Sequence, residues 1–206
     1  MTKPPALSED ARRRLNDEIA MLRSMWDQFV ILFASGDDPP RVLNGCAPWF
    51  FGMTQRAIVR EVMLGIARLT DQPTQGSRSN LVLASLLNDP ALLRKPGLRR
   101  QLEKAINRVL ALAAPIRKHR NKYLAHLDHA TALGARSAVL PGVTAAHLSR
   151  TMQAIERAYN VHCRGVHHSS TSFEMTPVGD AKALLRVLSA SDRWRTLEAL
   201  RGAPAP

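Results

Sequence analysis

The chain has 206 residues and a formal net charge of +12, with 45% hydrophobic, 22% charged and 5% aromatic residues. This composition is typical of a globular core and excludes an intrinsically disordered chain. The two cysteines exclude a disulfide-rich scaffold, and no apolar run approaches the ~18 residues that span a bilayer. We therefore expect one cytoplasmic domain over residues 8–200, with no secretion signal and no membrane contact.

Apolar periodicity and capping residues predict an all-α fold. The first helix should begin after Ser8, whose hydroxyl can cap free backbone amides, and run to about Phe33. A loop over residues 36–40 should end it. One face of this helix carries the apolar residues that recur at steps of three and four: Leu15, Ile19, Leu22, Trp26, Phe29 and Phe33.

Five further helices are expected after that loop. The second should extend from about Pro48 to Leu69 and end in a polar loop over 71–79, and a short helix should follow over 80–87. A basic helix should begin after Pro96 and run to about His129, with a kink or an interruption at Pro115. The last two should cover residues 143–167 and 179–200.

Positive charge is concentrated around the basic helix. Residues 94–122 contain ten Lys or Arg and one acid. A local positive field of this kind attracts polyanions, of which nucleic-acid backbones are the most common. A solvated basic helix face is the alternative, and charge alone leaves both open.

One arginine falls on the face of the basic helix that should meet the core. The apolar seam consists of Val109, Leu112, Ile116, Tyr123 and Leu127, and Arg120 lies in line with it. An unpaired charge away from water costs several kcal/mol, so Arg120 needs a partner or a ligand. The neighbours that the sequence allows are Arg68, Asp71 and Glu61.

A second stripe beside this seam carries groups suited to acid–base chemistry. It consists of His119, Lys122, His126 and His129. Imidazole exchanges protons near neutral pH and arginine grips phosphate, and metal-free RNA cleavage needs a base, an acid and a cation. On a regular helix Arg120 and His126 lie about 120° apart, so they would need a local break or a second subunit to meet. Surface histidines and a structural arginine are the alternative interpretation.

The segment 117–128 reads Arg-Lys-His-Arg-Asn-Lys-Tyr-Leu-Ala-His-Leu-Asp. Arg120 and His126, with five residues between them, resemble the arginine and histidine that define the HEPN superfamily. The longer string is similar to the abortive-infection U branch of that superfamily. Arg68-Leu-Thr-Asp71, at the end of an earlier predicted helix, resembles a second segment of the same branch.

The resemblance implies a HEPN-type helical bundle with a core over 15–129 and additional C-terminal helices over 143–200. It implies a metal-independent endoribonuclease without cofactor, a homodimer, and a role as a toxin or phage-defence effector with an antitoxin or regulatory partner. Some HEPN proteins only bind, so a non-catalytic helical module that binds nucleic acid or protein is the alternative.

The resemblance also implies roles for individual residues. Arg120 would bind the scissile phosphate, His126 would be the acid or base, and Asn121 would orient one of them. Supporting residues would be Arg68, Asp71 and Asp128, and Asp71 or Asp128 is expected to pair with an arginine. The expected RNA-binding residues are Arg117, Lys118, His119, Lys122 and His129.

Two other groups of residues receive structural interpretations. Cys163 and His167 have the spacing of two metal ligands on one helix face, and His162 and His168 lie beside them. A polar helix end is the preferred interpretation, so no metal ligand is predicted. The aromatic residues are interpreted as core or dimer contacts: Trp26, Phe29, Phe33, Trp49, Phe50 and Phe51.

Overall fold

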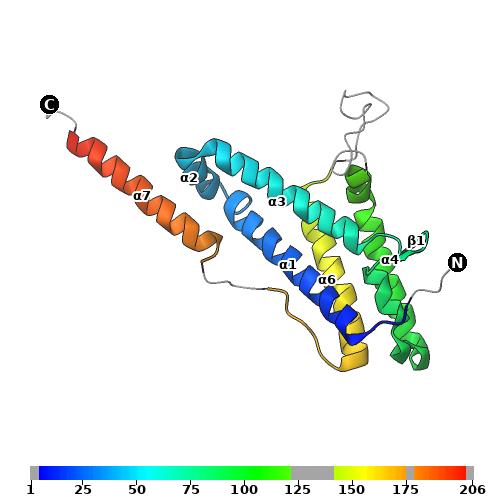
Figure 1. Ribbon diagram of the computed structural model, residues 1–206. Coiled ribbons are helices and arrows are strands. Elements are labelled where there is room, and N and C mark those ends of the chain that lie inside the picture. Colours follow the sequence, from blue (N-terminus) through cyan, green and yellow to red (C-terminus); the bar gives the residue numbers. More distant parts are fainter. Residues whose placement is uncertain (1–4, 122–141, 175–178, 203–206) are drawn as a thin grey trace. The chain divides into compact units, whose positions relative to one another are not determined.

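The computed structural model describes residues 5–121, 142–174 and 179–202. Within these ranges the regular secondary structure is helical apart from one short hairpin, which confirms the predicted all-α class (Figure 1). No helix in this part of the chain is both long and apolar enough to cross a bilayer. The described elements, in chain order, are α1 (Glu9–Phe33), α2 (Asp38–Cys46), α3 (Pro48–Leu69), β1 (Thr74–Gln75), β2 (Arg78–Ser79), the 3-10 helices η1 (Leu83–Asn88) and η2 (Pro90–Arg94), α4 (Pro96–His119), α6 (Ala145–His167) and α7 (Ala181–Gly202).

The predicted bounds of α1 and α3 are confirmed. Ser8 Oγ accepts a hydrogen bond from the backbone N–H of Ala11 at 3.2 Å, so the hydroxyl caps α1 as expected. The apolar face of α1 is buried from Leu15 to Phe29. The helix ends at Phe33, and α3 spans Pro48–Leu69.

The loop predicted over residues 36–40 is wrong beyond its first residues. Gly36 turns the chain at φ 114°, and α2 begins only two residues later at Asp38. Pro39 and Pro40 lie in the first turn of α2. Backbone N–H groups in the first turn have no acceptor within the helix, so a proline there removes no hydrogen bond. Prolines that suggest a loop in the sequence therefore open a helix in the structure.

The segment between α3 and α4 also differs from its prediction. Residues 74–79 form a two-stranded antiparallel hairpin that pairs Thr74 with Ser79, and Gly76 turns the chain at φ 63°. The short helix expected over 80–87 is replaced by η1 and η2, with Asp89 between them. A proline at the start of η2 prevents one continuous helix across Asp89.

The basic helix α4 continues through Pro115 to His119, so the interruption expected there does not occur. Pro115 has no N–H to donate to the preceding turn. In that turn the carbonyl oxygen of Leu112 accepts a hydrogen bond from His147 Nε2 at 2.8 Å. The contact ties this part of α4 to the first turn of α6.

The chain divides into two compact units. The second comprises residues 24–59 and the chain from 175 onward. Its core contains Leu32, Leu43, Phe51 and Ala181, and α2 packs against α7. Trp49 and Phe50 are 74% and 58% exposed, so a core role is wrong for these two aromatics and only the expected dimer contact is left.

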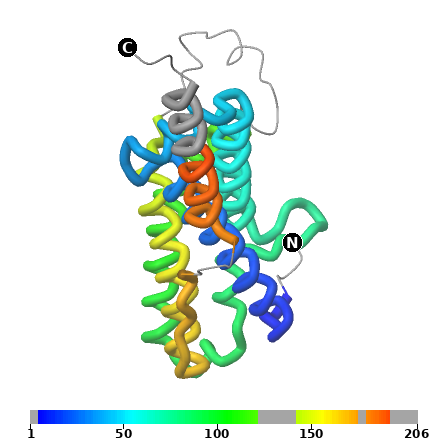
Figure 2. The backbone as a smooth tube through the Cα atoms, turned by 90° about the vertical axis from the view of Figure 1, so that its left-hand side faces the viewer, coloured from blue at the N-terminus to red at the C-terminus, as the bar shows by residue number. Residues whose placement is uncertain are grey.

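The first unit comprises residues 1–23 and 60–174 and contains the candidate site. In it α4 and α6 lie side by side, drawn in green and yellow in Figure 2. They are antiparallel, because the start of α4 meets the end of α6 at Leu98 and Gly165, whereas Leu112 meets His147. A Cβ at Gly165 would come within 2.4 Å of the Leu98 side chain, so glycine permits this close approach.

Candidate functional site

An ion pair between Arg120 and Asp71 forms the centre of the site. Arg120 follows the last residue of α4, and its Nη2 contacts both carboxylate oxygens of Asp71. Each side chain is 28% exposed, while Ile116, one turn earlier on the same face, is fully buried. The prediction that Arg120 needs a charged partner is therefore confirmed, and the partner is Asp71.

Asp71 is held in place by the end of α3 and by the loop that follows. The buried Thr70 hydroxyl donates to the carbonyl oxygen of Ile66 at 2.7 Å and closes the last turn of α3. Asn80 Nδ2 donates to the carbonyl oxygen of Gln72 at 2.9 Å, and the Asn80 N–H donates to that of Pro73 at 2.8 Å. Because hydrogen bonds hold the backbone before and after Asp71, they fix the position from which its side chain extends.

A second arginine approaches the same carboxylate. Arg117 Nη2 lies 3.9 Å from Asp71 Oδ1, and Arg117 is one helical turn before Arg120. Two guanidinium groups thus face one carboxylate, so this ion-pair group carries a net positive charge. Lys118 is exposed and His119 is half-buried in the same last turn of α4. Together these groups give the C-terminal end of α4 a surface suited to a phosphate group.

Arg68 does not belong to this ion pair. Its Nη2 donates to Glu18 Oε1 at 2.9 Å and to Glu61 Oε1 at 3.0 Å. The hydrogen bond to Glu18 is the main cause that raises the pKa of Arg68, and Glu61 adds to it. Arg68 and Glu61 are therefore wrong as partners of Arg120, because they pair with each other and link α3 to α1.

The backbone at Arg120 and Asn121 departs from a regular α-helix. Both residues are π-helical and follow directly after α4. A π-helical turn widens the helix and shifts the directions of side chains, and such turns are frequent at functional sites. The angle of about 120° expected between Arg120 and His126 assumes a regular helix, and His126 lies outside the described residues.

Part of the predicted site lies outside the described residues. This applies to His126, Lys122, Asp128 and His129. Of the predicted set, the structure brings together Asp71, Arg117 and Arg120 and separates Arg68 from them. The approach of Arg117 to Asp71 was missed, although the three-residue step from Arg117 to Arg120 placed both on one side of the helix.

A family model described as AbiU2, from the HEPN group of families, matches residues 8–184. The chain belongs to this HEPN family. The match confirms the resemblance to the abortive-infection U branch and extends it beyond the expected core over 15–129. It covers both motif segments, all of α6 and the first residues of α7. Comparisons with curated proteins and with solved structures gave no match.

Membership in the AbiU2 family gives the Asp71–Arg120 pair its context. In this family a helical HEPN domain is expected, and the observed fold is helical. Arg120, the candidate motif arginine, occupies a half-buried position at the end of a basic helix. Membership in the family indicates a HEPN-type function.

Proposed function

We propose that this chain is a metal-independent endoribonuclease of the HEPN type that acts in the cytoplasm as a homodimer. In this proposal it is a toxin or phage-defence effector controlled by an antitoxin or regulatory partner. The observation that carries the proposal is the half-buried Asp71–Arg120 pair within the AbiU2-family match. The positive surface formed by Arg117, Lys118 and His119 supports RNA as the substrate.

Arg120 is proposed to bind the scissile phosphate. A guanidinium carries five N–H donors, so the contact from Nη2 to Asp71 is compatible with a phosphate contact through another N–H. Asp71 restricts the rotamers of Arg120 and lowers the entropy lost when phosphate binds. In the transition state the guanidinium would stabilise the extra negative charge of the phosphorane. Arg117 would add charge at the same phosphate or at its neighbour.

The proposed reaction is an internal transfer within RNA. A base accepts the proton of the ribose 2'-hydroxyl, and the 2'-oxygen forms a bond to phosphorus. The bond from phosphorus to the 5'-oxygen breaks, and an acid gives that oxygen a proton. The products are a 2',3'-cyclic phosphate and a 5'-hydroxyl. His126 is proposed as the acid or base, and Asn121 as the residue that orients it or Arg120.

The remaining residues receive accessory roles in this proposal. RNA-binding residues are Arg117, Lys118, His119, Lys122 and His129. Asp71 and Asp128 would support Arg120 or His126. Arg68 would act at a distance by fixing the end of α3, which leads directly to Asp71.

A non-catalytic module that binds nucleic acid or protein is the second candidate. It is favoured by one observation, which is that Arg120 lies in line with buried Ile116 and is already paired with Asp71. A structural arginine at the edge of a core has the same surroundings. Such a module would use the basic end of α4 for affinity without cleaving its ligand.

Cleavage of a labelled structured RNA in EDTA tests the proposal. The unaltered chain, His126→Ala and His168→Asn should be purified identically and compared. His168 is an exposed histidine at the end of α6 with φ 52°, and asparagine tolerates that conformation. We expect products with 2',3'-cyclic phosphate ends from the unaltered chain and the control, and at least about a hundredfold less product from His126→Ala. Equal cleavage by all three proteins would contradict the proposal, and RNA binding without cleavage would favour the binding module.

A further inference from the structure

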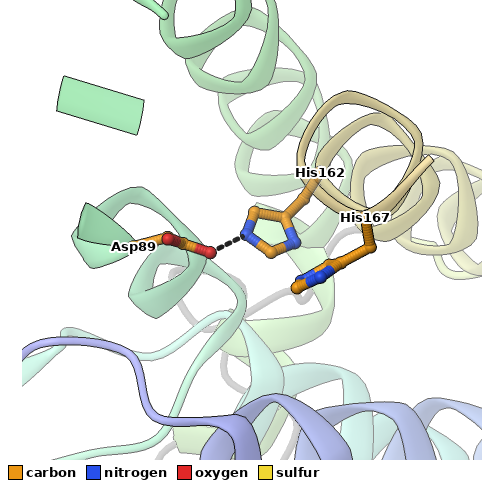
Figure 3. A group of neighbouring side chains, drawn as sticks. All are labelled: Asp89, His162 and His167. Carbon is orange, nitrogen blue, oxygen red and sulfur yellow. Dashed lines mark hydrogen bonds and ion pairs between the residues drawn. The ribbon is translucent and has the colours of Figure 1, made fainter. Parts of the chain in front are cut away.

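A second polar cluster lies at the other end of α4 and α6. It consists of Asp89, His162 and His167, whose ligand atoms all lie within 4.8 Å of one another (Figure 3). His162 and His167 belong to the last turns of α6, and Asp89 lies between η1 and η2. The 24 residues of α4 correspond to about 36 Å of helix, so this cluster is distant from Arg120.

Asp89 fixes the orientation of the His162 ring. Asp89 Oδ1 accepts a hydrogen bond from the N–H of Ala91 at 2.8 Å, so the carboxylate caps η2. Asp89 Oδ2 lies 2.8 Å from His162 Nε2. A carboxylate accepts hydrogen bonds, so the proton of a neutral His162 ring belongs on Nε2. The lone pair of that ring is then on Nδ1.

His162 Nδ1 has no partner among the described residues. The side chain is 0% exposed, and Nδ1 is the one buried side-chain polar atom in the described part of the chain that makes no hydrogen bond. Burial is the main cause that lowers the pKa of His162, while Asp89 opposes the shift, so the neutral ring is favoured. An unsatisfied buried acceptor is unfavourable, so a ligand bound to Nδ1 would stabilise the fold.

His167 supplies a second imidazole at the same place. Its ring centroid lies 5.6 Å from that of His162, and the rings are inclined by 62°. In Figure 3 the His162 nitrogen that does not face Asp89 is directed toward the His167 ring. His167 is exposed and ends α6, where the helix dipole favours a positive charge.

We propose that His162 Nδ1 and His167 bind a first-row transition-metal ion such as Zn²⁺, with Asp89 as the positioning residue of His162. Imidazole nitrogens are ligands for Zn²⁺, and a carboxylate that holds the other nitrogen of a ligating histidine is a recurrent outer-shell partner. Water would complete the coordination sphere from the exposed His167 side. The ion would stabilise the last turns of α6, which the contact of His162 with Asp89 already links to the η1–η2 segment, and would take no part in RNA cleavage.

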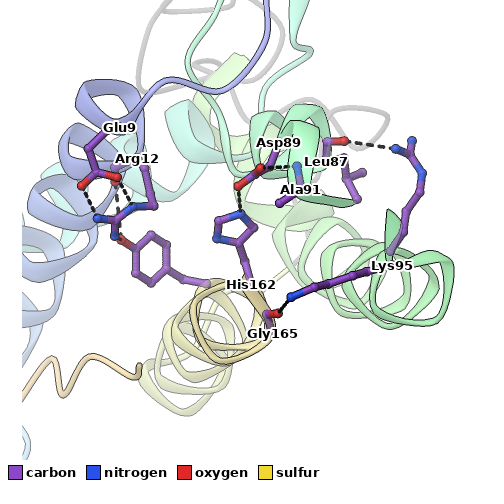
Figure 4. A network of polar contacts seen from close by, with 10 residues as sticks. Glu9, Arg12, Leu87, Asp89, Ala91, Lys95, His162 and Gly165 are labelled. Atoms are coloured by element: carbon purple, nitrogen blue, oxygen red, sulfur yellow. Dashed lines mark hydrogen bonds and ion pairs between the residues drawn. The ribbon is translucent and has the colours of Figure 1, made fainter. Parts of the chain in front are cut away.

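The charges around the cluster are compatible with a cation. Burial is the main cause that lowers the pKa of His162, and His167 and then Arg12 add smaller effects in the same direction. Arg12 is itself paired, because Nε donates to Glu9 Oε2 at 2.9 Å and Nη1 donates to the Tyr159 hydroxyl at 3.1 Å (Figure 4). The Glu9 carboxylate is also close enough for the charge of His167 to contribute to its lowered pKa, after the larger effect of Arg12. Glu9 thus offsets the repulsion from Arg12.

The cluster differs from the pair that sequence spacing suggested. Cys163 and His167 have the i, i+4 step, yet Cys163 is buried beside Tyr159 and is not part of the cluster. His168 is also outside it. The cluster combines His162 and His167 of α6 with Asp89, which lies 73 positions before His162, a combination that no local spacing reveals.

Zinc titration of the full chain tests the site. The protein is freed of metal with EDTA, exchanged into chelator-free buffer and titrated with Zn²⁺ by calorimetry, and its melting temperature is measured with and without Zn²⁺. We expect saturable binding and a rise in Tm of about 5 °C when zinc is about 100 times Kd. His167→Ala removes an exposed ligand without opening the core, so the variant should fold, lose the Tm rise and bind one Zn²⁺ fewer.

Two further variants separate this site from other histidines. Asp89→Asn keeps the side-chain shape and should weaken zinc binding by about 10–100-fold. His168→Asn should bind as the unaltered chain does. Zinc that binds elsewhere, for example at the histidines of 119–129, would remain in His167→Ala. Unchanged stoichiometry and Tm response in His167→Ala, or no zinc binding by the unaltered chain, would overturn the proposal and leave a buried water as the partner of Nδ1. RNA cleavage in EDTA is unaffected by either outcome, so this proposal and the ribonuclease proposal fail separately.

Discussion

At each end of α4 an aspartate from the segment between α3 and α4 pairs with a basic side chain. The two pairs differ in how far they are exposed. At the C-terminal end, Asp71 and Arg120 are each 28% exposed. At the N-terminal end, Asp89 is 13% exposed and its partner His162 is fully buried. A half-exposed ion pair can accept a further anion from solvent, whereas a buried pair mainly fixes the elements that carry it. Exposure therefore separates the end suited to substrate binding from the end suited to structural stability.

The balance of charge differs in the same direction. Two guanidinium groups, from Arg117 and Arg120, share the carboxylate of Asp71. At the other end one imidazole uses one oxygen of Asp89, and the Ala91 N–H uses the second. The excess positive charge at the first end favours an anion such as phosphate. At the second end, Nδ1 of the His162 ring has no hydrogen-bond partner among the described residues.

The largest expected effect comes from Arg120→Lys. Lysine keeps the charge and loses the planar fork, so it should hold neither Asp71 nor a phosphate in the same geometry. We expect RNA cleavage to fall by about 10²–10³-fold, or about 3–4 kcal/mol of transition-state stabilisation. Single-turnover cleavage with saturating protein measures it. Arg41→Lys is the control, since Arg41 pairs with Asp38 on an exposed surface. If Arg120→Lys cleaves as fast as this control, Arg120 has no role in the reaction.

Asp89→Ala should have the next largest effect, on stability. The substitution removes the cap of η2 and the hydrogen-bond partner of buried His162. We expect the free energy of unfolding to fall by about 2–3 kcal/mol. Urea unfolding in EDTA measures it without any contribution from metal.

Asp38→Ala is the matched control for that experiment. Like Asp89, Asp38 lies at the start of a helix and pairs with a basic side chain, that of Arg41, but the Asp38 side chain is exposed. Its loss should cost about 0.5 kcal/mol or less. Equal costs for the two substitutions would show that burial does not distinguish the two kinds of aspartate.

Sequence reasoning was accurate where local rules decide the structure. The capping of α1 by Ser8 and the apolar face from Leu15 to Phe29 follow from spacing alone. The start of α2 was missed because Pro39 and Pro40 are compatible with a loop and with a first helical turn. Only the packing of α2 on α7 and the burial of Leu43 favour the helix, and neither is local.

The candidate site shows the same division. The position of Arg120 in line with the apolar seam predicted that it needs a partner or a ligand. The sequence offered three neighbours for it. Residue spacing alone could not select Asp71, because the pairing depends on how the loop after α3 is held by Thr70 and Asn80. The family resemblance narrowed the expected partner of an arginine to Asp71 or Asp128. The pair of Asp89 and His162 was not foreseen at all, since 73 positions separate them and no motif links them.

The smallest expected effect concerns Arg117. Its Nη2 lies 3.9 Å from Asp71 Oδ1, which is longer than a hydrogen bond, so the loss of this side chain should leave Arg120 in place. We expect Arg117→Ala to weaken RNA binding about three- to tenfold and to reduce the slope of log K against log salt by about 1. Cleavage of bound RNA should continue at nearly the same rate, because the phosphate that reacts is assigned to Arg120. Fluorescence anisotropy at several salt concentrations, together with single-turnover cleavage, measures both quantities. A fall in cleavage rate as large as that of Arg120→Lys would mean that the two guanidinium groups act on the same phosphate. An unchanged salt slope would instead place the RNA away from this end of α4.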